Sequence, residues 1–230
     1  MRYVIKGREI FTQEGILENT SILIENGKIA SIGADGETGA AVINLQKYRI
    51  LPGLIDIHIH GANGFDAMDA NYYSLNEISK YLAANGVTSF LPTTVTARMD
   101  KIHNAVKNIS EAIGRGLDGA RALGSFIEGP YISKEYRGVH AEDYIREIDI
   151  EEIESLIEMS NNTVRIFAVA PEKKNALHMI RRLKEKGIKI ALGHTNTTYR
   201  EAVDAIESGA SIAVHLYNGM RGLHHREAGM

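Results

Sequence analysis

The sequence predicts an α/β protein, because short apolar segments alternate with longer helical segments over most of its length. The chain changes in texture near residue 50: short β-rich segments separated by turns come before it, and the alternation begins at Leu51. Strands that alternate with helices pair in parallel. We therefore expect a small β module in residues 1–49 and a parallel sheet, closed into a barrel or open, in residues 50–230.

The predicted β module is marked by a tight hairpin turn. Asn26 and Gly27 both accept the positive φ that such turns require. The segments on either side of them should therefore pair. The strands expected in this module are residues 3–6, 21–25, 28–33 and 41–45.

Six strands and five intervening helices are predicted in the second part of the chain. The strands are residues 54–60, 87–91, 122–128, 164–170, 188–192 and 211–215, and the helices are residues 74–85, 99–115, 150–160, 173–186 and 197–208. Gly86, Gly187 and Gly209 should end helices, and Asn196 or Thr197 should cap the last one. An eight-unit (β/α) barrel takes about 250 residues. About 180 follow residue 50, so a barrel here would contain about six βα units.

Composition excludes several classes of protein. A net charge of −3 in 230 residues gives no basis for binding nucleic acid or an anionic membrane. The absence of cysteine excludes disulfides, thiolate zinc sites and a cysteine nucleophile. The N-terminal residues do not resemble a signal peptide, and no apolar segment is long enough to cross a bilayer. We therefore expect a cytoplasmic protein.

The first candidate site lies in the predicted strand at residues 54–60. Because side chains alternate along a strand, Asp56, His58 and His60 share one face and the three isoleucines between them share the other. In a barrel the isoleucines would pack under helices and the histidines would point inward. Two imidazoles at i and i+2 can reach one metal ion. The other interpretation is a half-exposed strand whose polar residues face water.

Glu128, His194 and His215 each end another predicted strand. Taken singly, Glu128 could be a solvated loop acid, and either histidine could lie near the core with its hydrogen bonds satisfied. Together with His58 and His60 they form a set of imidazoles and a carboxylate that suits Zn²⁺ or Fe²⁺. All five fall at the same end of their strands, where barrel active sites lie. The sequence therefore predicts a shared metal site.

These motifs resemble the amidohydrolase superfamily and, within it, the N-acetylglucosamine-6-phosphate deacetylases. The resemblance covers essentially the whole chain and is carried by His-Ile-His at 58–60 after Leu-Pro-Gly-Leu-Ile-Asp, Ile-Glu-Gly-Pro-Tyr at 127–131, Gly-His-Thr-Asn at 193–196, His-Leu-Tyr-Asn-Gly-Met at 215–220 and His-Arg-Glu at 225–227. It implies a TIM-type (β/α)8 barrel of the amidohydrolase type. It also implies a small N-terminal β-sandwich module that C-terminal strands complete.

The resemblance also implies roles for single residues. Glu128, His194 and His215 match the family's principal metal ligands, whereas His58 and His60 match a pair that supplies a second ion in some members. We therefore expect zinc or iron, one or two ions per subunit.

Four further residues match substrate-binding positions of the family. His140 matches a histidine that contacts substrate, and Asn218 and the backbone of Gly219 match groups that hold the sugar or its phosphate. Arg226 matches an arginine that binds phosphate from the neighbouring subunit, which implies a homodimer. Ala228 stands where the family usually has proline.

The implied reaction belongs to amino-sugar metabolism. A metal-activated water would hydrolyse the N-acetyl group of N-acetylglucosamine 6-phosphate and give glucosamine 6-phosphate and acetate. The metal and His140 would stabilise the oxyanion. The family's general-base aspartate lies on the eighth strand and is expected beyond residue 230, since Asp56, Asp66 and Asp69 do not match it. We therefore expect residues 1–230 alone to deacetylate poorly.

Two other interpretations remain open. The first is another amidohydrolase that acts on a small amide, such as a cyclic-amide hydrolase. Those enzymes usually carry a bridging lysine where Glu128 stands, which argues against this interpretation. The second is a fragment that binds metal through the five ligands and catalyses nothing.

Overall fold

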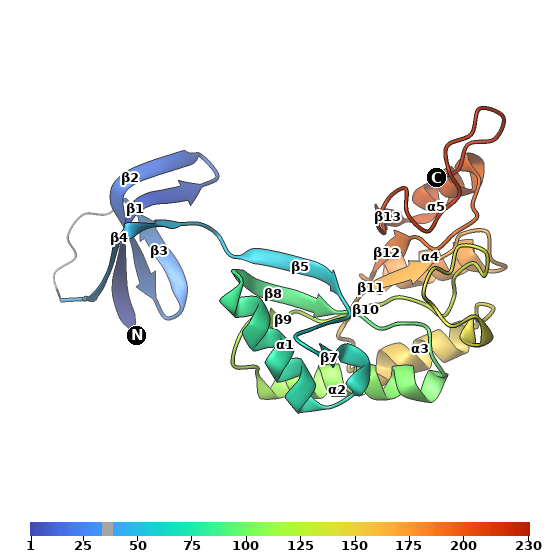
Figure 1. Cartoon of the computed structure of the whole chain (residues 1–230), viewed down its shortest axis with the longest axis horizontal. Coiled ribbons are helices and arrows are strands. Elements are labelled where there is room, and N and C mark those ends of the chain that lie inside the picture. Colours follow the sequence, from blue (N-terminus) through green and yellow to red (C-terminus); the bar gives the residue numbers. More distant parts are fainter. Residues whose placement is uncertain (34–38) are drawn as a thin grey trace. The chain divides into compact units, whose positions relative to one another are not determined.

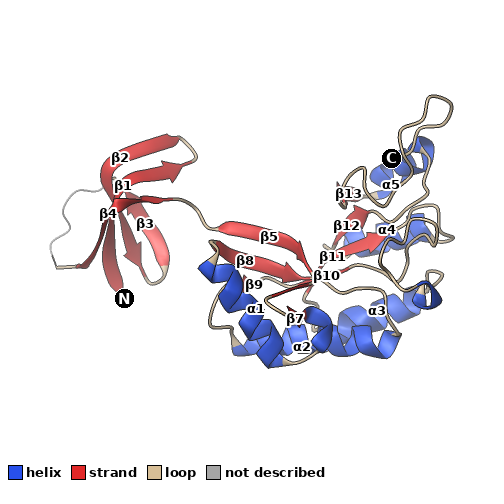
Figure 2. Cartoon of the chain, in the orientation of Figure 1, coloured by secondary structure: helices blue, strands red, loops and turns tan. Residues whose placement is uncertain are grey.

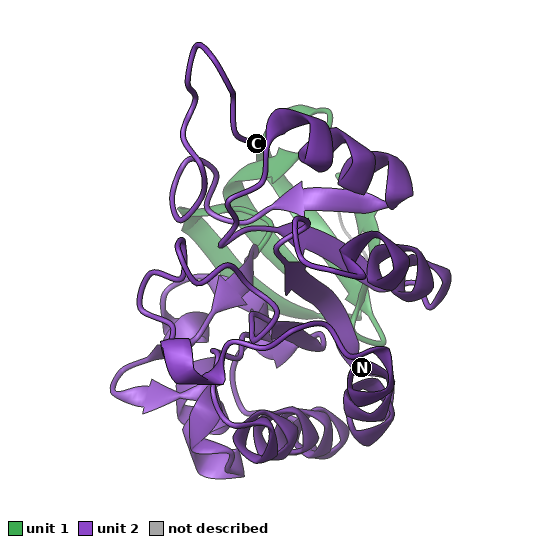
Figure 3. Cartoon of the chain, turned by 90° about the vertical axis from the view of Figure 1, so that its right-hand side faces the viewer, with its two compact units in different colours: residues 1–53 green, residues 54–230 purple. Residues whose placement is uncertain are grey.

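The structure is a computed structural model that describes residues 1–33 and 39–230 (Figure 1). The chain divides into two compact units, Met1–Gly53 and Leu54–Met230 (Figure 3). The boundary predicted from the sequence, after residue 49, lies four residues before the division between the units.

The first unit is a single four-stranded sheet in the order β3-β2-β1-β4. Its strands are β1 (Arg2–Thr12), β2 (Gly15–Glu25), β3 (Lys28–Ile32) and β4 (Ala41–Ile50). The predicted hairpin is confirmed, because Glu25 pairs with Lys28 while Asn26 and Gly27 have φ of 51° and 75°. Within the described residues of this unit no second sheet faces the first, and the β-sandwich stays a prediction.

The second unit contains two parallel sheets, ordered β5-β8-β9 and β10-β11-β12-β13. The strands are β5 (Leu54–Ile59), β8 (Val87–Pro92), β9 (Arg121–Ala122), β10 (Ser125–Ile127), β11 (Val164–Val169), β12 (Lys189–Leu192) and β13 (Ala210–Ala213). A parallel bridge between Thr93 and Phe126 joins the two sheets. Because the strands follow chain order and are parallel, their carboxyl ends meet on one side.

Five α-helices alternate with these strands and cover one face of them (Figure 2). They are α1 (Tyr72–Ala84), α2 (Met99–Arg115), α3 (Ile150–Met159), α4 (Ala176–Glu185) and α5 (Tyr199–Ser208). A short hairpin of β6 (Gly61–Ala62) and β7 (Phe65–Asp66) and two 3₁₀ turns, Ala67–Asp69 and Glu142–Tyr144, complete the unit. No helix in the described part of the chain is long and apolar enough to span a membrane.

Strands β10, β11 and β12 are apolar on both faces, as expected for a parallel sheet. Phe167 and Ile190 belong to the core formed with the helices, whereas Phe126, Ile166 and Ala191 form a separate cluster on the other face. Consecutive residues of one strand thus pack on opposite faces of the sheet. This arrangement fixes the directions in which the side chains at the strand ends can point.

The predicted strand at 122–128 is split into β9 and β10. Gly124 lies between them with φ of 154°, and a Cβ there would come within 2.3 Å of the Thr163 carbonyl oxygen. The close approach of the neighbouring backbone therefore requires glycine and interrupts the strand. β9 pairs with β8, whereas β10 pairs with β11.

Two local predictions are wrong. Ile55 and Ile57 were expected to pack under helices, but they are 61% and 47% exposed. The reason is that β5 is an edge strand and α1, the next helix, packs on β8. The cap of α5 is Thr198, not Asn196 or Thr197: its side chain accepts from the Glu201 N–H, and the Glu201 carboxylate accepts from the Thr198 N–H.

The Thr198→Ala variant should lower the free energy of unfolding by about 1 kcal/mol, because it removes half of this capping box. Urea denaturation monitored by circular dichroism measures the change, and Thr198→Ser, which keeps the hydroxyl, should stay near the wild type. Equal stability of the alanine variant and the wild type would contradict this account of the helix start.

Candidate metal centre

Five predicted ligand residues come together at the carboxyl ends of the parallel strands. His58 lies in β5 and His60 follows it, while Glu128, His194 and His215 come shortly after β10, β12 and β13. Their ligand atoms form two groups that share Glu128, and within each group the atoms lie within 4.8 Å of one another. The fold thus assembles residues that are up to 157 positions apart in the sequence, from 58 to 215.

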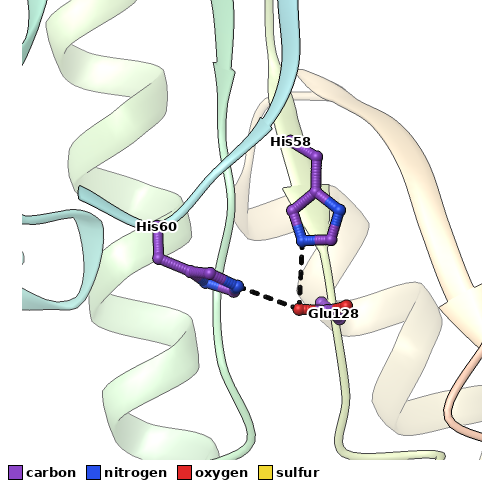
Figure 4. A group of neighbouring side chains, drawn as sticks. All are labelled: His58, His60 and Glu128. Atoms are coloured by element: carbon purple, nitrogen blue, oxygen red, sulfur yellow. Dashed lines mark hydrogen bonds and ion pairs between the residues drawn. The ribbon is translucent and has the colours of Figure 1, made fainter. Parts of the chain in front are cut away.

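The first group is His58, His60 and Glu128 (Figure 4). The Nε2 atoms of His58 and His60 lie 3.2 Å and 3.0 Å from Oε2 of Glu128. Both histidines therefore point at one oxygen of the same carboxylate.

The second group uses the other oxygen of the carboxylate. Oε1 of Glu128 lies 3.3 Å from Nε2 of His194 and 3.4 Å from Nε2 of His215. The two Nε2 atoms are themselves 3.0 Å apart. Glu128 thus lies between the two groups and could bridge two ions.

The outer nitrogens of three of these histidines face backbone carbonyl oxygens. Nδ1 lies 3.2 Å from the Thr93 oxygen for His60, 2.8 Å from the Tyr136 oxygen for His194 and 2.6 Å from the Asn218 oxygen for His215. Since a carbonyl can only accept, Nδ1 must donate in each case. A neutral ring then presents the lone pair of Nε2 to the centre, which is the arrangement of a histidine metal ligand.

Several atoms of the centre are arranged to receive a cation. Two Nε2 lone pairs 3.0 Å apart repel each other, and the buried Oε1 of Glu128 has no hydrogen-bond partner. A cation among Glu128, His194 and His215 would satisfy all three atoms at once. The residues present therefore fit a divalent metal ion.

Because the carboxylate and the imidazoles lie so close together, they shift one another's pKa values. Burial raises the pKa of the Glu128 carboxyl, but the imidazoles of His140, His194, His58 and His60 outweigh it and the pKa lies well below its ordinary value. The hydrogen bond to Glu128 raises the pKa of His60. Burial lowers the pKa of His194, and Glu128 and the Tyr136 carbonyl more than reverse this. Protons therefore compete with a metal for these nitrogens.

The centre lines a cavity of about 370 Å³. Its lining comprises His58, His60, Glu128, Gly138, Val139, His140, His194, His215, Asn218 and Gly219. His140 is buried, and its Nε2 lies 3.6 Å from Oε2 of Glu128. Gly219 has φ of 64°, and a Cβ there would lie 3.2 Å from the His215 ring, so glycine leaves room for the ligand.

Three predicted substrate-binding residues, His140, Asn218 and Gly219, thus lie at the cavity, whereas Arg226 does not line it. Arg226 is exposed on the loop after β13, where its backbone N–H donates to Nδ1 of His224. Among the residues that line the cavity, only Glu128 carries a carboxyl group.

The site predicted from the sequence does not include the threonines that follow β8. Thr93, Thr94 and Thr96 are all buried, and each forms a hydrogen bond with a residue of the site. Their signal in the sequence is the run Pro-Thr-Thr-Val-Thr directly after an apolar strand.

Known proteins resemble both the sequence and the fold. The chain is 41% identical over 230 residues to N-acetylgalactosamine-6-phosphate deacetylase of Escherichia coli O157:H7 and 45% identical over 207 residues to N-acetylglucosamine-6-phosphate deacetylase of Vibrio furnissii. The first match includes 100% of this chain and 60% of the relative, and the second includes 90% of this chain and 52% of the relative. The chain thus spans only part of the length of these relatives.

Solved structures of deacetylases also match nearly the whole of this chain. N-acetylglucosamine-6-phosphate deacetylase of Pasteurella multocida matches 100% of this chain and 60% of its own, with a TM-score of 0.91 and 32% identity. A variant of the Mycobacterium smegmatis enzyme, in complex with N-acetyl-D-glucosamine-6-phosphate, matches 99% of this chain and 59% of its own, with a TM-score of 0.90 and 28% identity. The predicted α/β fold of the amidohydrolase type is confirmed.

The amidohydrolase family matches residues 49–229, nearly the whole of the second unit together with the residues that lead into it. The match includes every residue of the candidate metal centre. The chain belongs to the amidohydrolase family.

Proposed function

We propose that the complete protein hydrolyses the N-acetyl group of N-acetylglucosamine 6-phosphate to give glucosamine 6-phosphate and acetate. The observation that carries the proposal is the convergence of a buried carboxylate, Glu128, with the Nε2 atoms of His194 and His215 in a cavity. The deacetylase names of the relatives support this reaction. The proposal includes a closed (β/α)8 barrel, a completed β-sandwich and a homodimer in the cytoplasm.

Glu128, His194 and His215 would hold the principal ion, zinc or iron, and His58 and His60 would hold a second ion with the other oxygen of Glu128. A divalent cation there supplies Lewis acidity, which lowers the pKa of a water molecule and polarises the amide carbonyl. Because Oε1 and Oε2 of Glu128 face different histidines, one carboxylate can serve both positions.

His140 would donate a hydrogen bond from Nε2 to the acetyl oxygen. Its Nδ1 accepts the Thr96 N–H at 3.1 Å, so the proton of a neutral ring lies on Nε2, which faces the cavity. A donor placed before the reaction begins stabilises the negative charge that develops on that oxygen. The group that takes the proton of the water and gives it to the amine would be the aspartate that the resemblance to the deacetylases implies.

The sugar would lie against Asn218 and Gly219, with its phosphate bound by Arg226 of a neighbouring subunit. The exposed position of Arg226 supports action on another subunit, because it does not line the cavity of its own chain. N-acetylgalactosamine 6-phosphate, the C4 epimer, is a second candidate substrate, because a relative 41% identical over the whole chain carries that name. Kinetics with both sugars would separate the two candidates.

The non-catalytic and cyclic-amide alternatives have less support. A carboxylate, not a lysine, stands at position 128, and a purely structural metal site would not need His140, a buried histidine that lines the cavity without belonging to either ligand group. Turnover of acetylated sugar phosphates by the complete gene product tests both alternatives at once. If that protein hydrolyses neither epimer, the proposed function is wrong.

The wild-type protein purified without chelators should contain at least one zinc or iron ion per chain, and His194→Ala or His215→Ala should abolish this occupancy. His58→Ala should remove only ions beyond the first. Elemental analysis by mass spectrometry gives the stoichiometry, with His178→Ala, an exposed histidine on α4, as the matched control. The ligand assignment is wrong if the wild type stays metal-free after incubation with zinc and iron, or if His178→Ala loses metal as His194→Ala does.

Arg226→Ala should raise KM for N-acetylglucosamine 6-phosphate by roughly 10- to 100-fold and leave the unphosphorylated sugar unaffected. The reason is that a hydrogen bond to a charged group contributes about 1.5–3 kcal/mol. Steady-state kinetics of the complete gene product measure both substrates, and Arg200→Ala on α5 is the control for loss of an exposed arginine. Equal effects on the two sugars would show that Arg226 does not bind the phosphate.

A further inference from the structure

We propose that Thr93, Thr94 and Thr96, the threonines that follow β8, are positioning residues that hold the metal ligands and His140 in place. β8 pairs with β5, which carries His58, and the segment after it is bridged at Thr93 to Phe126 of β10, yet β8 contributes no ligand itself. Each threonine contacts a different part of the site. The catalytic consequence for Thr96 rests on the proposed function, whereas the consequences for Thr93 and Thr94 rest only on metal binding.

Thr93 holds the segment from His58 to His60. The pairing of β5 with β8 shifts register between Asp56 and Ile59. At this irregularity the Ile59 N–H donates to Oγ1 of Thr93 at 3.0 Å, and that hydroxyl donates to the Leu91 carbonyl at 3.1 Å. The carbonyl of Thr93 also accepts from Nδ1 of His60. One buried residue therefore fixes both the backbone between the two histidines and the ring of the second.

Thr94 holds Glu128. Its Oγ1 accepts the Glu128 N–H at 3.2 Å, and its own N–H donates to the Phe126 carbonyl at 3.0 Å. Thr94 is fully buried, and Glu128 is only 1% exposed. Because Glu128 follows the last residue of β10, its N–H lies at the end of the ladder and takes a side-chain acceptor. The hydroxyl thus fixes the backbone from which the shared carboxylate projects.

Thr96 holds His140. Its N–H donates to Nδ1 of His140 at 3.1 Å, and its Oγ1 lies 2.7 Å from the same nitrogen. An N–H can only donate, so Nδ1 accepts and Nε2 faces the cavity as the donor. The hydroxyl is seated against Gly129, where a Cβ would come within 2.0 Å of Oγ1. The glycine beside Glu128 therefore leaves the space that Thr96 occupies.

Removing the hydroxyl of each threonine should affect either metal binding or turnover, depending on the residue that it contacts. Valine has the shape of threonine without the hydroxyl, so Thr93→Val and Thr94→Val leave a buried N–H without an acceptor beside metal ligands. Thr96→Val loosens His140, which is not among the metal ligands. The first two variants should therefore weaken metal binding, whereas the third should weaken turnover alone.

The test is zinc affinity and steady-state kinetics of the complete gene product, with zinc measured by competition with a chromophoric chelator. Thr93→Val and Thr94→Val should weaken zinc binding about 10- to 100-fold, and Thr93→Ser and Thr94→Ser should restore it. Thr96→Val should keep the wild-type zinc affinity and lower kcat about 10-fold or more, and Thr96→Ser should restore kcat. The matched control is Thr163→Val, which removes a hydroxyl bound to the Ser160 carbonyl near the opposite end of β11.

The orientation of His140 has its own measurement, which does not depend on turnover. Nitrogen-15 spectra of the wild type should show His140 protonated on Nε2 and not on Nδ1, because Nδ1 accepts the backbone N–H of Thr96. A wild-type ring protonated on Nδ1 would overturn the role of Thr96. This measurement stands even if a valine variant does not fold.

Failure of this proposal differs from failure of the proposed function. Wild-type zinc affinity in folded Thr93→Val and Thr94→Val would overturn the positioning roles of both threonines. A loss of affinity as large in Thr163→Val would do the same. If the wild type binds zinc but does not hydrolyse either acetylated sugar phosphate, the proposed function fails, and the zinc affinities and nitrogen spectra still decide the roles of the threonines.

Discussion

The site depends on one constraint, the burial of the Glu128 carboxylate at the end of a parallel strand. Glu128 is 1% exposed, and an isolated charge in such a place costs several kcal/mol after relaxation. Positive charge must therefore gather around it. Imidazoles reach it from β5 and from the ends of β12 and β13, and they outweigh the effect of burial on its pKa. A divalent cation bound by these imidazoles would supply the positive charge that protons on the imidazoles would otherwise supply.

The backbone around the centre departs from regular geometry where the ligands leave their strands. His194 and His215 have φ of 47° and 31°, in the left-handed region that residues with a side chain rarely adopt. Such conformations cost on the order of 1–3 kcal/mol each and persist where the surroundings enforce them. The hydrogen bonds from their Nδ1 atoms to Tyr136 and Asn218 help to hold both rings toward Glu128.

The sequence predicted much of this arrangement, because the relevant signals are local. The alternation of strands and helices, the Asn26-Gly27 turn and the five residues at strand ends all follow from periodicity and turn chemistry. The split at Gly124 was not predictable, since it results from the approach of the Thr163 carbonyl in another segment. The exposure of Ile55 was not predictable either, because strand periodicity indicates the face on which a residue lies but not whether a helix covers that face. The buried threonines after β8 escaped notice because their partners lie 34 to 44 positions away.

We propose that Glu128, His194 and His215 hold a transition-metal ion. Anomalous diffraction from crystals of the zinc-loaded protein, recorded on both sides of the zinc edge, tests it most directly. We expect a zinc peak about 2.0–2.2 Å from Oε1 of Glu128 and from Nε2 of both histidines. A peak bound elsewhere in the molecule, or none at the carboxyl ends of the strands, would contradict this account.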